Sequence, residues 1–176
     1  MQLIQAFSTD QLHLIKALYE KSFPACERKP FSLILEKQAA GTVDVLSLED
    51  NVGFCGLAIT MKYNDLVLLD YFAVAEERRG TGLGSAALLA LYAYYPARRF
   101  FLEIESTKEN AANKRQRLQR KHFYLKNGLS ELGIDACVFG TNMELLGHNI
   151  TLTFDEYFSV YKNIYGLKKA EHVKEL

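Results

Sequence analysis

The stretch from residue 66 to residue 95 constrains the fold of this chain most strongly. It begins with "LVLLDYFAV", which is apolar on both alternating faces apart from Asp70 and is typical of a strand buried on both sides. The glycine-rich segment "ERRGTGLGS" follows, and apolar side chains then recur at helical spacing until Pro96 ends the pattern. A strand, a glycine-rich turn and a helix in this order direct unpaired backbone N–H groups toward an anion. The stretch therefore predicts a site for a phosphate-bearing ligand.

The size and charge of the chain limit what surrounds this site. A chain of 176 residues, 49% of them hydrophobic, can bury one sizeable core, which predicts a single domain over residues 1–176. The 21 basic residues equal the 21 acidic residues in number, so no global field attracts nucleic acid or a membrane surface. We therefore expect no nucleic-acid partner and no membrane partner, and recognition of any anion must be local.

Two further absences shape the expectations. The N-terminal residues show neither a cationic lead into an apolar run nor a membrane span, which predicts a cytoplasmic protein. Cys26, Cys55 and Cys137 have no CxxC spacing, and the four histidines are scattered. Because a metal site needs several converging ligands, we expect no metal cofactor and free, mostly buried thiols.

The rest of the chain predicts an α+β domain whose centre is a βαβ unit. Hydrophobic periodicity, turn residues and capping residues define the elements. The expected strands are 1–7, two within 42–65 around a turn at 49–53, 66–74, 98–106 and two around Gly140; the expected helices start after Ser8 and at 32, 84, 110 and 153.

Two familiar phosphate loops fit the glycine segment poorly. A Walker A loop is excluded because no Lys-Ser or Lys-Thr follows the glycines. The dinucleotide-binding motif matches more closely, since Gly82, Gly84 and Ala87 satisfy GxGxxA and acidic residues lie about 20 positions further on. Against it, "AEERR" separates the strand from the glycines, and only one further strand–helix step follows. An NAD(P)-binding Rossmann-type oxidoreductase therefore remains a minor alternative.

A third interpretation rests on family resemblance. The run from Arg79 to Gly84 resembles the R/Q-x-x-G-x-G/A signature of the GNAT N-acetyltransferase superfamily, with "LDYFAV" before it and "SAALLALY" after it. Downstream, "LEIE" resembles the fifth strand of that family, and "FYLKNGL" resembles its Tyr-x-x-x-Gly-Phe element. The resemblance implies a central mixed, mostly antiparallel sheet flanked by helices, with a splayed βαβ cofactor site. It also implies that the loop holds the pyrophosphate of acetyl-CoA.

The resemblance also identifies cofactor-binding residues. The backbone of two strand residues would pair with the pantetheine, and the loop and first helical turn would bind the phosphates. The implied residues are Phe72, Val74, Arg79, Gly80, Thr81, Gly82, Leu83, Gly84 and Ser85. The sequence departs from the family pattern in two places: Arg117 stands where an Asn is frequent, and Leu129 replaces the Phe. The first departure affects a side-chain contact to the pantetheine, and neither affects the phosphate loop.

Acyl transfer to an amine needs a proton donor and a base. Tyr124, the Tyr of the family element, is the candidate acid, because a phenol near pKa ~10 can donate to a thiolate near ~8.5. Glu103 is the candidate base; Glu105 projects from the same strand face about 7 Å away and is an alternative, as is Asp70. Alternatively, Tyr124 only packs, and Glu103 and Glu105 pair with Arg98, Arg99 or the basic helix.

The sequence thus predicts an acyl-CoA-dependent N-acyltransferase that moves acetyl from acetyl-CoA to a primary amine of a small molecule or peptide. No activated Cys or Ser constellation favours an acyl-enzyme, so we expect direct attack in a ternary complex. The main alternative is an acyl-CoA-binding regulator on the same fold. The late strands and terminal helix could supply a homodimer surface, although their aromatic residues are better suited to packing against the sheet.

Overall fold

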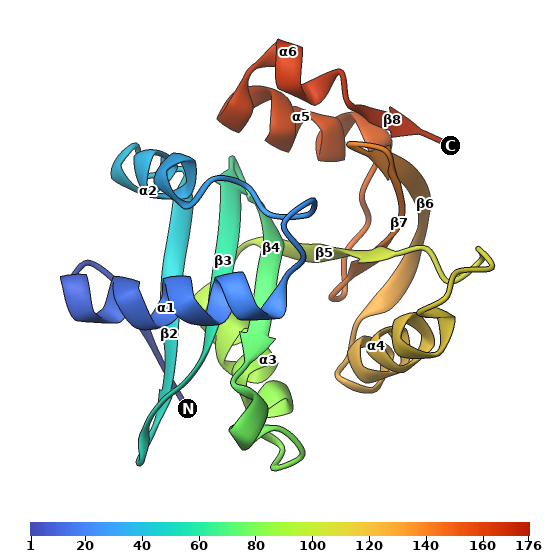
Figure 1. Ribbon diagram of the computed structural model, residues 1–176. Helices are drawn as coiled ribbons and strands as arrows, with labels where there is room; N and C mark the ends of the chain where they lie inside the picture. Colours follow the sequence, from blue (N-terminus) through green and yellow to red (C-terminus); the bar gives the residue numbers. More distant parts are fainter. The chain divides into compact units, whose positions relative to one another are not determined.

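The computed structural model describes all residues 1–176 and contains both helices and strands (Figure 1). The elements, in chain order, are β1 (Gln2–Gln5), α1 (Thr9–Ser22), α2 (Phe31–Ala39), β2 (Val43–Asp50), β3 (Gly53–Tyr63), β4 (Leu66–Val74), the 3-10 turn η1 (Glu76–Arg78), α3 (Leu83–Tyr94), β5 (Arg99–Glu105), α4 (Lys114–Lys126), β6 (Ser130–Val138), β7 (Thr141–Gly147), α5 (Phe154–Tyr165), α6 (Leu167–Ala170) and β8 (Val173–Glu175). No helix is both long and apolar enough to cross a membrane.

The strands form one sheet in the order β1-β2-β3-β4-β5-β7-β6-β8. Strand β2 is antiparallel to β1 and to β3, β7 is antiparallel to β5 and to β6, and β8 is antiparallel to β6. This mostly antiparallel α+β fold confirms the predicted fold class. A doubly wound parallel sheet, which a Rossmann-type oxidoreductase requires, is not the architecture of this chain.

The chain forms two compact units, and the boundary between them falls within strands β3 and β4. The first unit comprises Met1–Met61 and Leu69–Pro96, and the second comprises Lys62–Leu68 and Ala97–Leu176. The expectation of a single domain over residues 1–176 stays a prediction.

In the first unit, helix α1 crosses in front of strands β2, β3 and β4 (Figure 1). The helix begins where the sequence predicts, because the Ser8 side chain caps it by accepting a hydrogen bond from the Gln11 amide. Its apolar stripe, represented by Ile15 and Tyr19, is almost completely buried. The predicted hairpin of β2 and β3 is also confirmed, with Val43 opposite Met61 and Asp50 opposite Gly53.

Gly56 of β3 makes a tight contact that matters for β4. A Cβ atom at this position would overlap the carbonyl oxygen of Ala73, which is backbone and cannot rotate away. At Gly147, by contrast, a Cβ would meet only the side chains of Ile150 and Leu132. We expect Gly56→Ala to destabilise the protein by about 1–3 kcal/mol and Gly147→Ala by less. Thermal unfolding of the two variants tests this order, and an equal or reversed loss would contradict it.

In the second unit, the terminal helix packs on the sheet as expected. Helix α5 begins with the predicted capping box, in which Thr153 and Glu156 each bond the other's backbone amide. Tyr157 and Tyr161 are 0% and 1% exposed, and the ring of Tyr157 meets that of Phe101 in β5 edge to face. The rings of Tyr157 and Tyr161 therefore pack against the sheet. The short strand β8 was not predicted from the sequence.

Candidate active site

The glycine-rich loop connects β4 to α3 through the turn η1. Gly80 and Gly82 have φ angles of +77° and +85°, in the left-handed region that a side chain disfavours. Gly82 is the N-cap of α3 but has no side chain with which to cap it. Leu83, Gly84 and Ser85 form the first helical turn and are half-buried, while the loop before them is exposed.

The backbone amides of this loop lack acceptors. None of the N–H groups of residues 80–85 donates a hydrogen bond within the chain, and the first helical bond of α3 runs from Ala86 to Gly82. Six consecutive amides are thus available to an external acceptor. The N-terminal end of a helix also carries a partial positive charge, so the preferred acceptor is an anion.

The two loop arginines have different roles. Arg78 forms an ion pair with Asp50, at the end of β2, and so fastens the loop to the hairpin. Arg79 is exposed and donates from Nε to the carbonyl oxygen of Val74 at 3.1 Å, which leaves the rest of its guanidinium available to an anion. The Thr81 hydroxyl donates to the Arg78 carbonyl oxygen at 2.8 Å and so stabilises the turn.

Strand β4 leads directly into this loop. The Ala75 amide donates to the carbonyl of Cys55 at 2.9 Å, and the Ala73 carbonyl also faces β3. Because backbone groups of alternate residues point to opposite edges of a strand, those of Phe72 and Val74 point away from β3. The phosphate loop and these two strand residues both belong to the first unit.

Tyr124 lies on α4 in the second unit, where its side chain is 8% exposed. Its hydroxyl has no hydrogen-bond partner within the chain. Burial raises the pKa of Tyr124 to about 12, although the nearby Arg120 cation acts in the opposite direction. The phenol therefore keeps its proton throughout the neutral range and is suited to donate it.

Glu103 of β5 faces helix α5. Its Oε1 accepts hydrogen bonds from the Tyr157 hydroxyl at 2.7 Å and from the Tyr161 hydroxyl at 2.9 Å. These two phenols fix the orientation of the carboxylate and stabilise its charge. These partners were not predicted from the sequence, although their spacing of four residues on a helix places both on one face.

Glu105 is held by the basic helix instead. Its carboxylate pairs with Arg117 at 2.8 Å and with Arg120 at 3.0 Å, and it accepts from Asn113. The ion-pair alternative is therefore confirmed for Glu105. Arg117 also bonds the Asn113 side chain at 2.8 Å, so the departure from the family pattern at this position serves to hold α4 against β5.

Asp70 of β4 is likewise neutralised. Its two carboxylate oxygens accept from the Lys29 ammonium at 2.7 and 2.8 Å, and the Asp70 side chain is only 6% exposed. The expectation that Asp70 is a structural acceptor in the strand therefore agrees with its contacts. Both oxygens of Asp70 are thus occupied by one ammonium.

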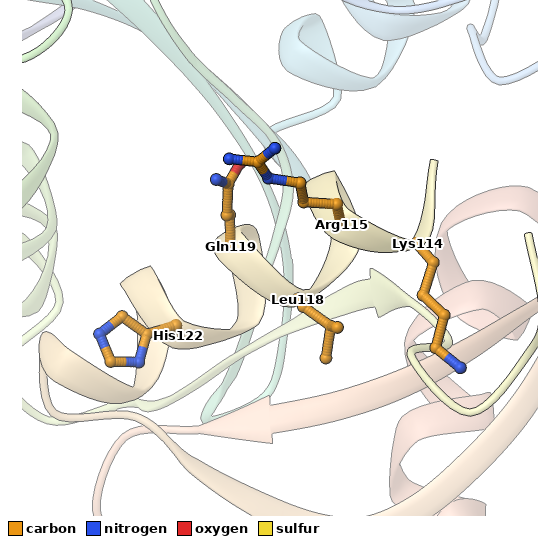
Figure 2. Close-up of a pocket in the computed structure, with 5 residues that line it drawn as sticks. All are labelled: Lys114, Arg115, Leu118, Gln119 and His122. Carbon is orange, nitrogen blue, oxygen red and sulfur yellow. The ribbon is translucent and has the colours of Figure 1, made fainter. Parts of the chain in front are cut away.

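The outer side of α4 carries a hollow of about 630 Å³, and Figure 2 shows its lining residues projecting from this one helix. They are Lys114, Arg115, Leu118, Gln119 and His122. Lys114 and Arg115 belong to the first turn of the helix, so the hollow has a cationic end. No group of three or more His, Cys, Asp or Glu side chains is arranged to hold a metal ion.

Comparisons with known proteins agree with this fold. A profile of the acetyltransferase (GNAT) family matches residues 10–128, about two thirds of the chain. No curated protein sequence matches significantly. A GNAT-family protein from Bacteroides thetaiotaomicron has a similar structure, with a TM-score of 0.80, 19% identity, and coverage of 95% of this chain and 99% of that chain.

Two enzymes with known acceptors share the fold at lower similarity. A chimera of the spermidine N-acetyltransferase SpeG from Vibrio cholerae with hSSAT gives a TM-score of 0.66 at 15% identity, covering 84% of this chain and 96% of that one. The ribosomal-protein-S18-alanine N-acetyltransferase of Escherichia coli gives 0.62 at 18% identity, covering 86% and 95%. Together with the family match over residues 10–128, the fold establishes that this chain belongs to the acetyltransferase (GNAT) family.

Proposed function

We propose that this protein is an N-acetyltransferase that moves the acetyl group of acetyl-CoA to a primary amine by direct attack in a ternary complex. The observation that carries the proposal is the row of six unpartnered amides at residues 80–85. A diphosphate supplies enough oxygen acceptors for such a row, and the dipole of α3 favours its charge. The fold of an acetyltransferase family supports acetyl-CoA as the ligand that brings the diphosphate.

The residues of the first unit fit this ligand. The left-handed glycines leave the loop surface open to phosphate oxygens, and no atom lies within 4 Å of a Cβ built at Gly80 or Gly82. Arg79, Thr81 and the first turn of α3 would surround the diphosphate. The backbone groups of Phe72 and Val74 that point away from β3 would pair with the amides of the pantetheine.

The reaction needs one bond formed and one broken. The neutral amine attacks the thioester carbon, the C–N bond forms, and the C–S bond then breaks to release the thiolate. Tyr124 would give its hydroxyl proton to that sulfur, and the proton that the attacking nitrogen loses would restore the phenol. Burial that raises the pKa of Tyr124 also raises the pKa of a thiol bound in the same dry site. The thiolate is then a better acceptor for the phenol proton than it would be in water. The products are the N-acetyl amine and CoA.

Glu103 is the carboxylate that we propose as the base. Glu105 is paired with two arginines and Asp70 with Lys29, so both carboxylates already have cationic partners. Glu103 is bound by phenol hydroxyls, which orient it but also stabilise its charge. A carboxylate held in this way acts best through an ordered water that collects the ammonium proton of the incoming amine.

A covalent acyl-enzyme finds no support among the cysteines. Burial raises the pKa of the Cys55 thiol, which opposes formation of a thiolate, and its sulfur donates to the Leu48 carbonyl. Cys26 is exposed and Cys137 is half-buried. Direct attack on the thioester is thus the simpler path, and it requires both substrates to be bound together.

The proposal is tested by release of CoA from acetyl-CoA across a panel of primary amines. We expect thiol release that depends on the amine, and mass spectrometry should show one added acetyl group on that amine. A second candidate is an acyl-CoA-binding regulator, which the open phosphate loop would equally support. Binding of acetyl-CoA without turnover on any amine would establish the regulator and reject the enzyme. Absence of CoA binding would reject both.

A further inference from the structure

A polar pocket lies in the first unit at the end of α1 and in the loop that follows it. Its volume is about 270 Å³, which is at the small end for ligand pockets and fits a molecule of amino-acid size. The lining residues are Tyr19, Glu20, Ala25, Arg28, Lys29 and Pro30. None of them belongs to the phosphate loop or to the proposed acid and base.

Arg28 is the unusual member of this pocket. Its Nε atom is buried and has no hydrogen-bond partner, and its guanidinium forms no ion pair within the chain. Burying part of a charged group without a partner is costly, so such a group points to a missing counterion. The hydroxyl of Ser22, the last residue of α1, is also buried without a partner.

The remaining charges of the pocket already have partners. Lys29 is neutralised by Asp70 at 2.7 Å, and Glu20 lies 4.0 Å from Lys16 on α1. Arg28 therefore leaves one positive charge to be matched. A planar guanidinium is best matched by a carboxylate, which it can bind through two parallel hydrogen bonds. The Glu20 carboxylate on the same pocket favours a singly charged anion over a doubly charged phosphate.

The pocket is fastened to the strand that we propose for the cofactor. The Tyr71 hydroxyl donates to the Glu27 carbonyl at 2.9 Å and accepts from the Lys29 amide at 3.1 Å, while the Lys29 ammonium binds Asp70. Residues 27–29 are therefore held at residues 70 and 71 of β4. Phe72, whose backbone would pair with the pantetheine, is the next residue along the strand.

We propose that Arg28 binds a carboxylate of the amine acceptor, so that the acceptor is a free amino acid or a peptide with an acidic residue beside its reactive amine. This inference rests on the proposed acetyl transfer, because only that reaction makes the bound compound an acetyl acceptor. Arg28 is then a specificity residue, and a simple polyamine, which lacks a carboxylate, is a poor substrate.

The first test measures binding without turnover. The side-chain Nε–H signal of Arg28 is assigned in the ¹⁵N spectrum by its loss in Arg28→Lys. The CoA-saturated protein is then titrated with L-amino acids and with their decarboxylated amines, such as L-alanine and ethylamine. A second arm compares the peptide amides Ala-Asp-NH₂ and Ala-Asn-NH₂. In at least one of the two arms, we expect the compound that carries a carboxylate to shift the Arg28 signal saturably. The matched compound without the carboxylate should not shift it.

The second test measures selectivity. Arg28→Gln should lower kcat/KM for the preferred carboxylate-bearing amine roughly tenfold to a hundredfold, as loss of a charge-assisted hydrogen bond does, and leave its decarboxylated partner within about threefold. Lys168→Gln removes the same charge from an exposed position of α6, far along the chain from the pocket, and should leave the ratio unchanged. The affinity for CoA should be the same in all variants.

The outcomes separate this inference from the proposed function. If no carboxylate of either arm shifts the Arg28 signal, or if the matched amines shift it equally, Arg28 is not a carboxylate site, whatever the enzyme acetylates. If a carboxylate shifts the signal but no amine is acetylated, the pocket is established and the transferase proposal fails. An unchanged selectivity ratio in Arg28→Gln would show that the pocket does not select the acceptor.

Discussion

Gly82→Val is expected to weaken CoA binding by roughly 100-fold or more, equivalent to about 2.7 kcal/mol. Gly82 is the left-handed N-cap of α3 and stands in the middle of the unpartnered amides. A β-branched side chain at a φ of +85° forces the backbone out of this conformation, which turns the amides away from a common acceptor. The branched side chain also occupies space that the phosphate oxygens would need.

Gly41→Val is the matched control for this change. Gly41 has a φ of +76°, and like Gly82 it has nothing within 4 Å of a built Cβ. Both variants should lose about 1–2 kcal/mol of stability from the left-handed backbone, but only Gly82→Val should lose CoA affinity. Calorimetric titration with CoA and thermal unfolding provide the two measurements. If both variants bound CoA as the wild type does, the phosphate site would have to lie elsewhere.

Much of the fold could be predicted from local sequence because its signals are local. Ser8 caps α1, and Thr153 with Glu156 caps α5, since each cap involves residues only a few positions apart. The phosphate loop follows the same logic: alternating glycines after a buried strand place the chain in the left-handed region at Gly80 and Gly82. Such features depend on backbone conformation and not on distant partners.

The features that could not be predicted depend on contacts between distant residues. The tyrosines that hold Glu103 come from a helix more than fifty positions further along the chain. Strand β8 exists because it pairs with β6, with Val173 opposite Val138, and its three residues carry no periodic signal of their own. The unpartnered guanidinium of Arg28 is visible only once all other partners are placed.

The different surroundings of Glu103 and Glu105 show the same limit. Both residues alternate along β5, so the sequence places them on one face and treats them as equivalent. In the folded chain Glu103 meets the phenols of α5, whereas Glu105 meets the guanidinium groups of α4. The positions of two helices are therefore needed to distinguish a candidate base from a structural ion pair. The spacing of residues along one strand does not give those positions.

Tyr124→Phe is expected to lower kcat by roughly 10² to 10³, in the range of a general acid, and to change the affinity for acetyl-CoA less than twofold. The hydroxyl has no partner within the chain, so its removal should leave stability within about 0.5 kcal/mol. Steady-state kinetics, calorimetric titration and thermal unfolding separate the three quantities. Tyr165→Phe, on the half-buried end of α5, is the matched control and should not change kcat.

The pH dependence provides an independent check on Tyr124. Burial raises its pKa from an ordinary 10 to about 12, so the donor remains protonated and kcat should show no descending limb below about pH 11. The same shift makes the unfolded chain release this proton first. The wild type should therefore lose stability relative to Tyr124→Phe as the pH rises from 10 toward 12, and not below pH 10. A descending limb near pH 8 that vanished in Tyr124→Phe would show that the phenol is not buried as described, and that the proton donor works by a lowered pKa.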